Sequence, residues 1–234
     1  MAALFQAGGM EPLSGQTRSA LELPPRPIDR NPPYRRIATE EAWSIPEITA
    51  AQLRLLASPD APDDTSLRMG GMFAGFADLQ DALCDIGAGR LARMDALGID
   101  RQLLLLTAPG VQVLDAIEGR ELAALSNDRL AEACRRHPDR FSGCLAFAPQ
   151  DVKGAVDEIE RGMKTLGLAG AVLNSHTRGH YLDEPQYWPI LEALEANDAA
   201  LYIHPTSPPT AMCAPYAFRS MTGALAGFSH EVWL

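Results

Sequence analysis

Long apolar runs are absent from this 234-residue sequence, in which no stretch approaches the roughly 20 residues that a membrane-spanning helix needs. Positive charge is also scarce, because 20 Lys and Arg stand against 30 Asp and Glu and give a formal net charge of −10. An acidic surface repels phosphate backbones and anionic lipid headgroups. We therefore expect neither a nucleic-acid partner nor a membrane partner.

Cysteine is sparse, and its four positions (Cys84, Cys134, Cys144 and Cys213) form no CxxC pair and follow no signal peptide. This usage is typical of a reducing compartment, where a buried cysteine behaves as a small hydrophobic residue. We expect a cytoplasmic protein with structural thiols.

Several motifs that would identify a chemistry are missing. The sequence has no GxGxxG after a strand, no GxxxxGK[ST] and no GxSxG, so neither a nucleotide-phosphate cradle nor an α/β-hydrolase serine is indicated. Asn-Gly turns are absent too, which disfavours an all-β fold.

A Pro-rich segment opens the chain and predicts a disordered tail over residues 1–33, followed by one domain over residues 34–234. In that domain short apolar runs alternate with amphipathic stretches. The runs predict strands at 36–40, 102–107, 141–147, 169–174 and 200–204. Helices are expected at 77–97, from beyond Gly110 to about His137, and at 151–166, 185–197 and 228–234. A further helix should begin at Pro46, with Ser44 as N-cap and Glu47 at the capping-box position, and residues 57–75 resemble a loop.

Strands that alternate with helices favour parallel pairing, because each helix returns the chain to the same end of the sheet. Two architectures are compatible with five such units. One is a doubly wound open sheet, and the other is part of a (β/α)₈ barrel, whose eight units typically take about 250 residues. Composition does not choose between them.

The carboxyl ends of parallel strands carry the functional groups in both architectures. Here these ends bring Glu40 and Glu41, the segment Asn174–His176, and His204. A carboxylate and a neutral imidazole are suitable ligands for Zn²⁺ or Mn²⁺. Each also has a structural interpretation: Glu40 as a solvated strand end, and His176 as a hydrogen-bond partner of loop backbone. His137, His180 and His230 are expected at helix ends or in loops.

A set of ordered segments resembles the decarboxylase branch of the amidohydrolase superfamily, and the 5-carboxyvanillate decarboxylases in particular, with the γ-resorcylate decarboxylases more distant. The segments are RIATEEAW at 36–43, RMDALGID at 93–100, TAPGVQ at 107–112, ND at 127–128, PDRF at 138–141, NSHT at 174–177, YLDE at 181–184 and YIHP at 202–205. The resemblance covers residues 35–234 and implies a (β/α)₈ barrel of the TIM type, of which about the first five βα units are present.

The resemblance also implies a site at the carboxyl rim. The family's metal ligands on its first and fifth strands match Glu40 and His204, the metal being Mn²⁺ or Zn²⁺, and His176 matches a histidine near the substrate pocket. Ala42 stands where many relatives have a second histidine. The substrate-binding arginine of the family aligns near Gly75 and is missing unless Arg68 replaces it.

The family's later histidine and its metal aspartate, the expected general acid, have no counterpart here, so the sequence resembles a C-terminally truncated member. The implied function is metal-dependent, non-oxidative decarboxylation of a hydroxylated aromatic acid such as 5-carboxyvanillate or a dihydroxybenzoate, by a chain whose intact relatives are homo-oligomers. Two alternatives stay open: a metal-dependent hydrolase of a lactone, ester or amide, and a non-catalytic product. In either enzyme, we expect Glu40 and His204 to converge to within about 6 Å.

Overall fold

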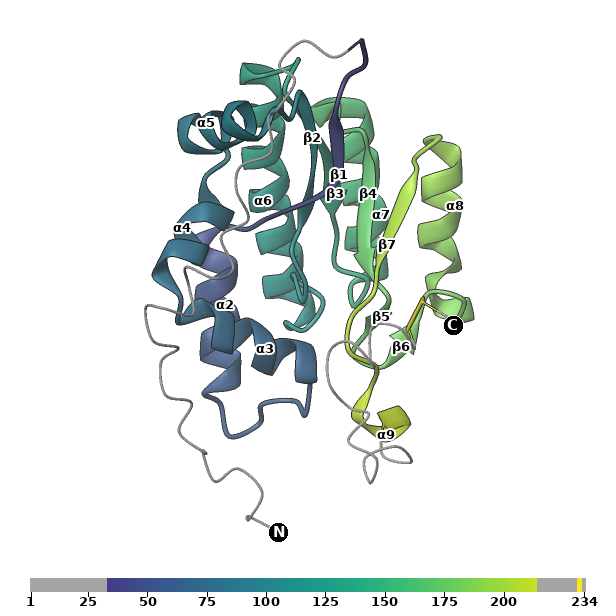
Figure 1. Ribbon diagram of the computed structural model, residues 1–234. Helices are drawn as coiled ribbons and strands as arrows, with labels where there is room; N and C mark the ends of the chain where they lie inside the picture. Colours follow the sequence, from purple (N-terminus) through teal and green to yellow (C-terminus); the bar gives the residue numbers. More distant parts are fainter. Residues whose placement is uncertain (1–32, 214–230, 233–234) are drawn as a thin grey trace, which may run out of the picture. The chain divides into compact units, whose positions relative to one another are not determined.

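The computed structural model describes residues 33–213 and 231–232 (Figure 1). The chain divides into two units between Pro33 and Tyr34, and the fold described below belongs to residues 34–234. The predicted tail, apart from Pro33, lies outside the described residues, as does most of the helix predicted at 228–234.

Five parallel strands form the central sheet, in the order β1-β2-β3-β4-β7. They are β1 (Ile37–Trp43), β2 (Arg101–Leu106), β3 (Phe141–Ala146), β4 (Gly170–Asn174) and β7 (Leu201–His204). Each neighbour in the sheet is also the next long strand in the chain. This is the connectivity that a (β/α) barrel wall requires.

Helices connect the strands, and a short antiparallel hairpin follows β4. The helices are α2 (Pro46–Leu56), α3 (Thr65–Ala74), α4 (Ala77–Cys84), α5 (Ala88–Leu97), α6 (Ala116–Arg136), α7 (Val152–Arg161), α8 (Trp188–Ala196) and α9 (Thr210–Cys213). A π-helical turn, η1 (Gly162–Leu166), extends α7, and a 3₁₀ turn, η2 (Pro185–Tyr187), precedes α8. The hairpin pairs β5 (His176–Thr177) with β6 (His180–Tyr181). Among the described residues, none of these helices combines the length and apolar character of a membrane span.

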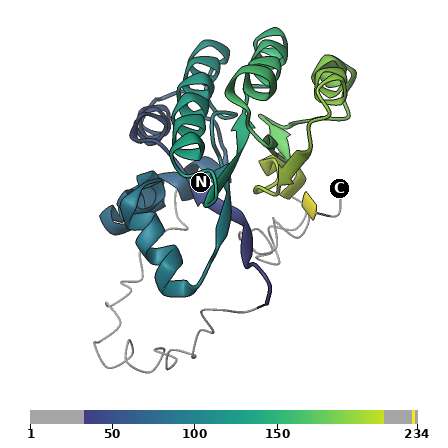
Figure 2. The same cartoon turned by 90° about the horizontal axis from the view of Figure 1, so that it is seen from above.

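The sheet is curled, and α6, α7 and α8 lie along its outer side (Figure 2). A doubly wound fold would place helices on both faces of an open sheet. The curled half-barrel therefore confirms the prediction of a partial (β/α)₈ architecture over the doubly wound alternative.

The core lies between the strands and the outer helices. Leu104 of β2, Leu130 of α6 and Leu145 of β3 are all fully buried there. Gly143 lets α6 approach β3 closely, since a Cβ at this position would lie 2.5 Å from the side chain of Leu130. Close packing of this kind fixes the wall from which the site residues project.

One sequence prediction was wrong at residues 57–75, which contain α3 as well as a loop. Pro62 and the pair Gly70–Gly71 disfavour a helix, glycine by about 1 kcal/mol per residue. Tertiary structure overrides this preference: Asp64 caps the helix by accepting a 2.8 Å hydrogen bond from the Leu67 backbone N–H. Leu67 itself is completely buried.

The helix predicted at 77–97 is interrupted, and the capping box predicted at Ser44 does not form. The break between α4 and α5 frees backbone carbonyls that the buried Arg90 satisfies, with hydrogen bonds to Asp85 O at 2.8 Å and Ala82 O at 3.2 Å. Ile45, not Ser44, is the N-cap of α2. Glu47 instead pairs with Arg129 at 2.6 Å.

Candidate metal and substrate site

Glu40 and His204 lie together, as predicted. Nε2 of His204 is 3.3 Å from Oε1 of Glu40, well inside the expected 6 Å. Glu40 sits at a β-bulge, because Ala38 pairs with Gln102 while Glu41 pairs with Leu104, leaving one extra residue on β1. Bulges commonly redirect a side chain next to a functional site.

The two adjacent carboxylates of β1 have different environments. Glu41 accepts a 2.8 Å hydrogen bond from Nε2 of Gln102, whose Oε1 in turn accepts a 3.3 Å bond from the buried Arg90. Glu40 faces His204 instead. The two carboxylates were predicted at a strand end, but β1 continues to Trp43, and of the pair only Glu40 lies against the imidazole.

Tyr202 completes this cluster, and the sequence analysis missed it. Its hydroxyl donates a 2.8 Å hydrogen bond to Oε2 of Glu40. Burial, together with the bond to the Glu40 carboxylate, raises the pKa of the Tyr202 phenol, which therefore remains a protonated donor at neutral pH. The available signal was its position two residues before His204, since alternate residues of a strand face the same side.

The chemistry and spacing of this pair fit a divalent metal. Ligand atoms about 2.1 Å from an ion lie between about 3.0 and 3.4 Å apart at octahedral or tetrahedral angles. The observed 3.3 Å falls in that range. Over residues 33–213 and 231–232, however, no three His, Cys, Asp or Glu side chains gather into a potential metal-binding group.

His176 lies in β5 and is buried, with both ring nitrogens bonded to backbone. Nδ1 accepts a 3.3 Å hydrogen bond from the Gly179 N–H, so Nε2 is the donor toward Ser207 O at 2.8 Å. Its ring also packs edge-to-face on Tyr181, with centroids 5.8 Å apart. These contacts match the structural interpretation of His176, and its contact with a substrate stays a prediction.

Gln112 binds the backbone of Asn174 and of His176, and the sequence analysis did not predict this role. Its Oε1 accepts a 2.7 Å bond from the Asn174 N–H, while Nε2 donates to His176 O at 3.0 Å and to Thr177 Oγ1 at 2.7 Å. The Asn174 side chain donates to Pro109 O at 3.0 Å. Together these bonds tie the loop after β2 to the end of β4.

The remaining candidates have local partners. Arg68 pairs with Asp63 and donates to Thr65 Oγ1 at 3.1 Å, so its guanidinium stabilises the start of α3, and its role as a substitute substrate ligand stays a prediction. His180 pairs with Glu184 at 2.9 Å on the surface.

The thiols of Cys84, Cys134 and Cys144 are less easily ionised than a free thiol. Burial raises the pKa of Cys134 and of Cys144 from 9.0 to about 11, and burial also raises that of Cys84. Thiolate, the reactive form, is therefore rare at neutral pH.

A cleft of about 510 Å³ opens in the helical layer, and none of the predicted site residues lines it. Trp43, Asp85 and Arg129 are among its walls. Arg129 is already paired with Glu47, so its charge is not free for a ligand.

Comparison with known proteins places the chain in a family. A protein-family model described as Amidohydrolase matches residues 54–232. A γ-resorcylate decarboxylase of Rhizobium radiobacter is 35% identical over 180 residues, which make up 74% of this chain and 50% of the relative. The chain thus spans about half the length of this curated relative.

Two solved structures are similar in fold and sequence. The 5-carboxyvanillate decarboxylase of Novosphingobium aromaticivorans, crystallised with manganese and a nitro-substituted hydroxymethoxybenzoic acid, is 43% identical with a TM-score of 0.79. The match covers 85% of this chain and 59% of that one. A 2,6-dihydroxybenzoate decarboxylase from Rhizobium is 33% identical with a TM-score of 0.67, over 84% of this chain and 58% of that one.

Proposed function

Since the chain belongs to the amidohydrolase family, in its branch of aromatic-acid decarboxylases, we propose that it serves the non-oxidative decarboxylation of a hydroxylated aromatic carboxylic acid. A divalent metal would be held by Glu40 and His204. The observation that carries the proposal is the 3.3 Å approach of these two side chains from opposite edges of the sheet.

The substrate class follows from the relatives. A 5-carboxyvanillate decarboxylase and a 2,6-dihydroxybenzoate decarboxylase both match over more than four-fifths of this chain. Their substrates share a benzoate ring with a hydroxyl beside the carboxylate. We assign the same class here, with Mn²⁺ as the metal, because that ion is present in the Novosphingobium structure, and Zn²⁺ as the alternative.

The residues of this chain would share the chemistry as follows. Glu40 would supply an anionic oxygen and His204 an imidazole nitrogen as ligands. The ion would supply positive charge to bind the substrate carboxylate and to stabilise charge that develops on the ring. Tyr202 keeps its proton and orients Glu40. His176, backed by Tyr181, would form part of the wall against the aromatic ring.

Decarboxylation replaces a carbon–carbon bond by a carbon–hydrogen bond, so the ring carbon needs a proton as CO₂ leaves. None of the described side chains is assigned this role. Tyr202 is committed to Glu40, and the ring nitrogens of His176 are bonded to backbone.

The test is CO₂ release by a chimera that joins this chain to the C-terminal part of the Novosphingobium decarboxylase that the match does not cover. With Mn²⁺ and carboxyl-labelled 5-carboxyvanillate or 2,6-dihydroxybenzoate, we expect labelled CO₂ that is lost on substitution Glu40→Gln. Opening of a lactone without CO₂ release would support the hydrolase alternative. A folded, metal-loaded chimera with neither activity would support a non-catalytic protein.

A further inference from the structure

We propose that Tyr202 is a positioning residue, which holds the carboxylate of Glu40 so that Oε1 faces the metal position beside His204 and Oε2 is withheld from it. The inference rests on the proposed function, because it concerns the same metal site. It adds a residue that acts through Glu40 and does not itself touch the metal.

The two oxygens of Glu40 are already distinguished by their partners. Oε2 accepts the 2.8 Å hydrogen bond from the Tyr202 hydroxyl, and Oε1 lies 3.3 Å from Nε2 of His204. A protonated phenol donates one hydrogen bond, so the oxygen it engages is the poorer metal ligand of the two. The arrangement therefore favours monodentate binding through Oε1.

Glu40 needs such support because, among the described residues, Tyr202 and His204 are the partners found for its carboxylate. Its side chain is 55% exposed and extends from a bulge on an edge strand. A glutamate that becomes fixed loses rotamer entropy, and a site that fixes it beforehand binds a metal more tightly. Tyr202 provides this fixation from the opposite edge of the sheet.

The strand β7 thus carries one proposed metal ligand, His204, and also Tyr202, which supports the other proposed ligand, Glu40. Tyr202 and His204 are alternate residues of β7, so they face the same side of the sheet. The spacing makes the position of Glu40 depend on the same strand that presents the imidazole. Loss of such a supporting hydrogen bond typically costs 10- to 100-fold in metal affinity.

The experiment measures the Mn²⁺ dissociation constant of the 234-residue chain by EPR of free Mn²⁺, for the wild type and for Tyr202→Phe. We expect Tyr202→Phe to raise the constant about 10- to 100-fold. Tyr187→Phe, which removes the hydroxyl of another tyrosine in a different part of the fold, should leave it unchanged. Thermal unfolding followed by circular dichroism confirms that each variant is folded.

A purely structural role is separated by two further variants. In a Glu40→Asp background, the shorter side chain no longer spans both partners, so Tyr202→Phe should have a much smaller effect than in the wild type. Replacement of Tyr202 by 4-aminophenylalanine restores a donor at the same place and should restore affinity. Equal effects of Tyr202→Phe in both backgrounds, or no rescue by the donor, would overturn the positioning role.

The outcomes distinguish this inference from the function on which it rests. If Glu40→Gln weakens Mn²⁺ binding but folded Tyr202→Phe does not, the positioning role is wrong and the metal site stands. If neither substitution changes binding, or the wild-type chain binds no Mn²⁺, the metal site and the role of Tyr202 are both overturned.

Discussion

Oε1 of Glu40 and Nε2 of His204 are 3.3 Å apart, although their strands are the two outer members of a five-stranded sheet. In a flat sheet, four spacings of about 4.8 Å would separate those strands by about 19 Å. The contact is therefore a consequence of the curl. The site forms because the curl brings the two outer strands together, and not because Glu40 and His204 are close in sequence.

The first prediction concerns metal binding. Glu40→Gln and His204→Ala each remove one of two ligands, so each should raise the Mn²⁺ dissociation constant at least about tenfold. Glu41→Gln is the matched control, because this neighbouring carboxylate bonds to Gln102 and does not face His204. Isothermal titration calorimetry would measure all three, and equal effects of Glu40→Gln and Glu41→Gln would contradict the assignment.

The second prediction concerns activity of the 234-residue chain by itself. In the described part of the chain, the cluster contains two potential metal ligands, whereas catalytic zinc sites usually have three from the protein. No general acid is assigned among the described side chains, and the lack of one typically costs a further 10²–10⁴-fold in rate. We expect negligible CO₂ release from 5-carboxyvanillate or dihydroxybenzoates, even with added Mn²⁺ or Zn²⁺, and much faster release by the chimera. Equal, substantial rates at matched metal concentration would show that the site is complete in this chain.

Sequence reasoning predicted the elements whose signal is local. The apolar run that forms β2 and the position of His204 at the end of β7 can be recognised along the chain. The strand predicted to end at Glu40 instead continues to Trp43, and the bulge in β1 directs Glu40 toward His204.

Sequence reasoning failed where contacts between distant residues determine the local structure. The helix α3 forms despite Gly70–Gly71 because Leu67 becomes buried, and the break before α5 depends on hydrogen bonds from Arg90.

The supporting residues of the site could not be predicted for the same reason. Gln112 bonds a segment 62 residues later, and Tyr202 bonds a carboxylate 162 residues earlier. A glutamine after a strand and a tyrosine inside one have ordinary local explanations. Their roles become visible only when the curl brings their partners within hydrogen-bond distance.

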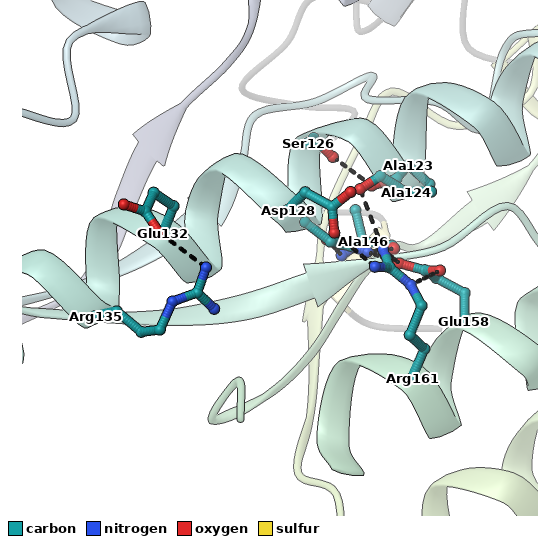
Figure 3. A network of polar contacts seen from close by, with 10 residues as sticks. Ala123, Ala124, Ser126, Asp128, Glu132, Arg135, Ala146, Glu158 and Arg161 are labelled. Carbon is teal, nitrogen blue, oxygen red and sulfur yellow. Dashed lines mark hydrogen bonds and ion pairs between the residues drawn. The ribbon is translucent and has the colours of Figure 1, made fainter. Parts of the chain in front are cut away.

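The third prediction concerns stability, and it uses the polar network between α6 and α7 (Figure 3). The buried Asn127 donates to Ala146 O at 2.7 Å and to Glu158 Oε1 at 2.6 Å, and accepts from the Ala146 N–H at 2.8 Å. Arg161 joins Glu158 at 2.8 Å and Asp128 at 2.5 Å. Asn127→Ala leaves buried polar groups at the end of β3 without hydrogen-bond partners. It should therefore lower the free energy of unfolding by about 2–4 kcal/mol.

Differential scanning calorimetry would measure this loss as a fall in Tm of roughly 5–15 °C. Glu132→Ala is the control, since Glu132 pairs with Arg135 and Arg136 on the surface. Exposed pairs contribute about 0–1 kcal/mol, so its Tm should change little. Similar shifts for the two variants would mean that the buried network does not stabilise the fold as inferred.

The fourth prediction concerns the thiols of Cys134 and Cys144. Burial favours the neutral form and raises both pKa values from 9.0 to about 11. At pH 8 the thiolate fraction should therefore be about 100-fold below that of an unfolded thiol, and alkylation by iodoacetamide correspondingly slower.

Mass spectrometry of each cysteine peptide over pH 8–11 tests this shift directly. In the folded chain, the alkylation rates of Cys134 and Cys144 should keep rising throughout this range, because both thiols are only about half ionised at pH 11. In urea the same peptides should reach half of their maximal rate near pH 9, the unshifted pKa, and level off above it. The neutral thiol is the form that the fold favours, so folding also weakens as pH rises from 9 toward 11. A folded-state profile that is half-maximal near pH 9 would show that solvent reaches both thiols and that their surroundings are more open than the structure indicates.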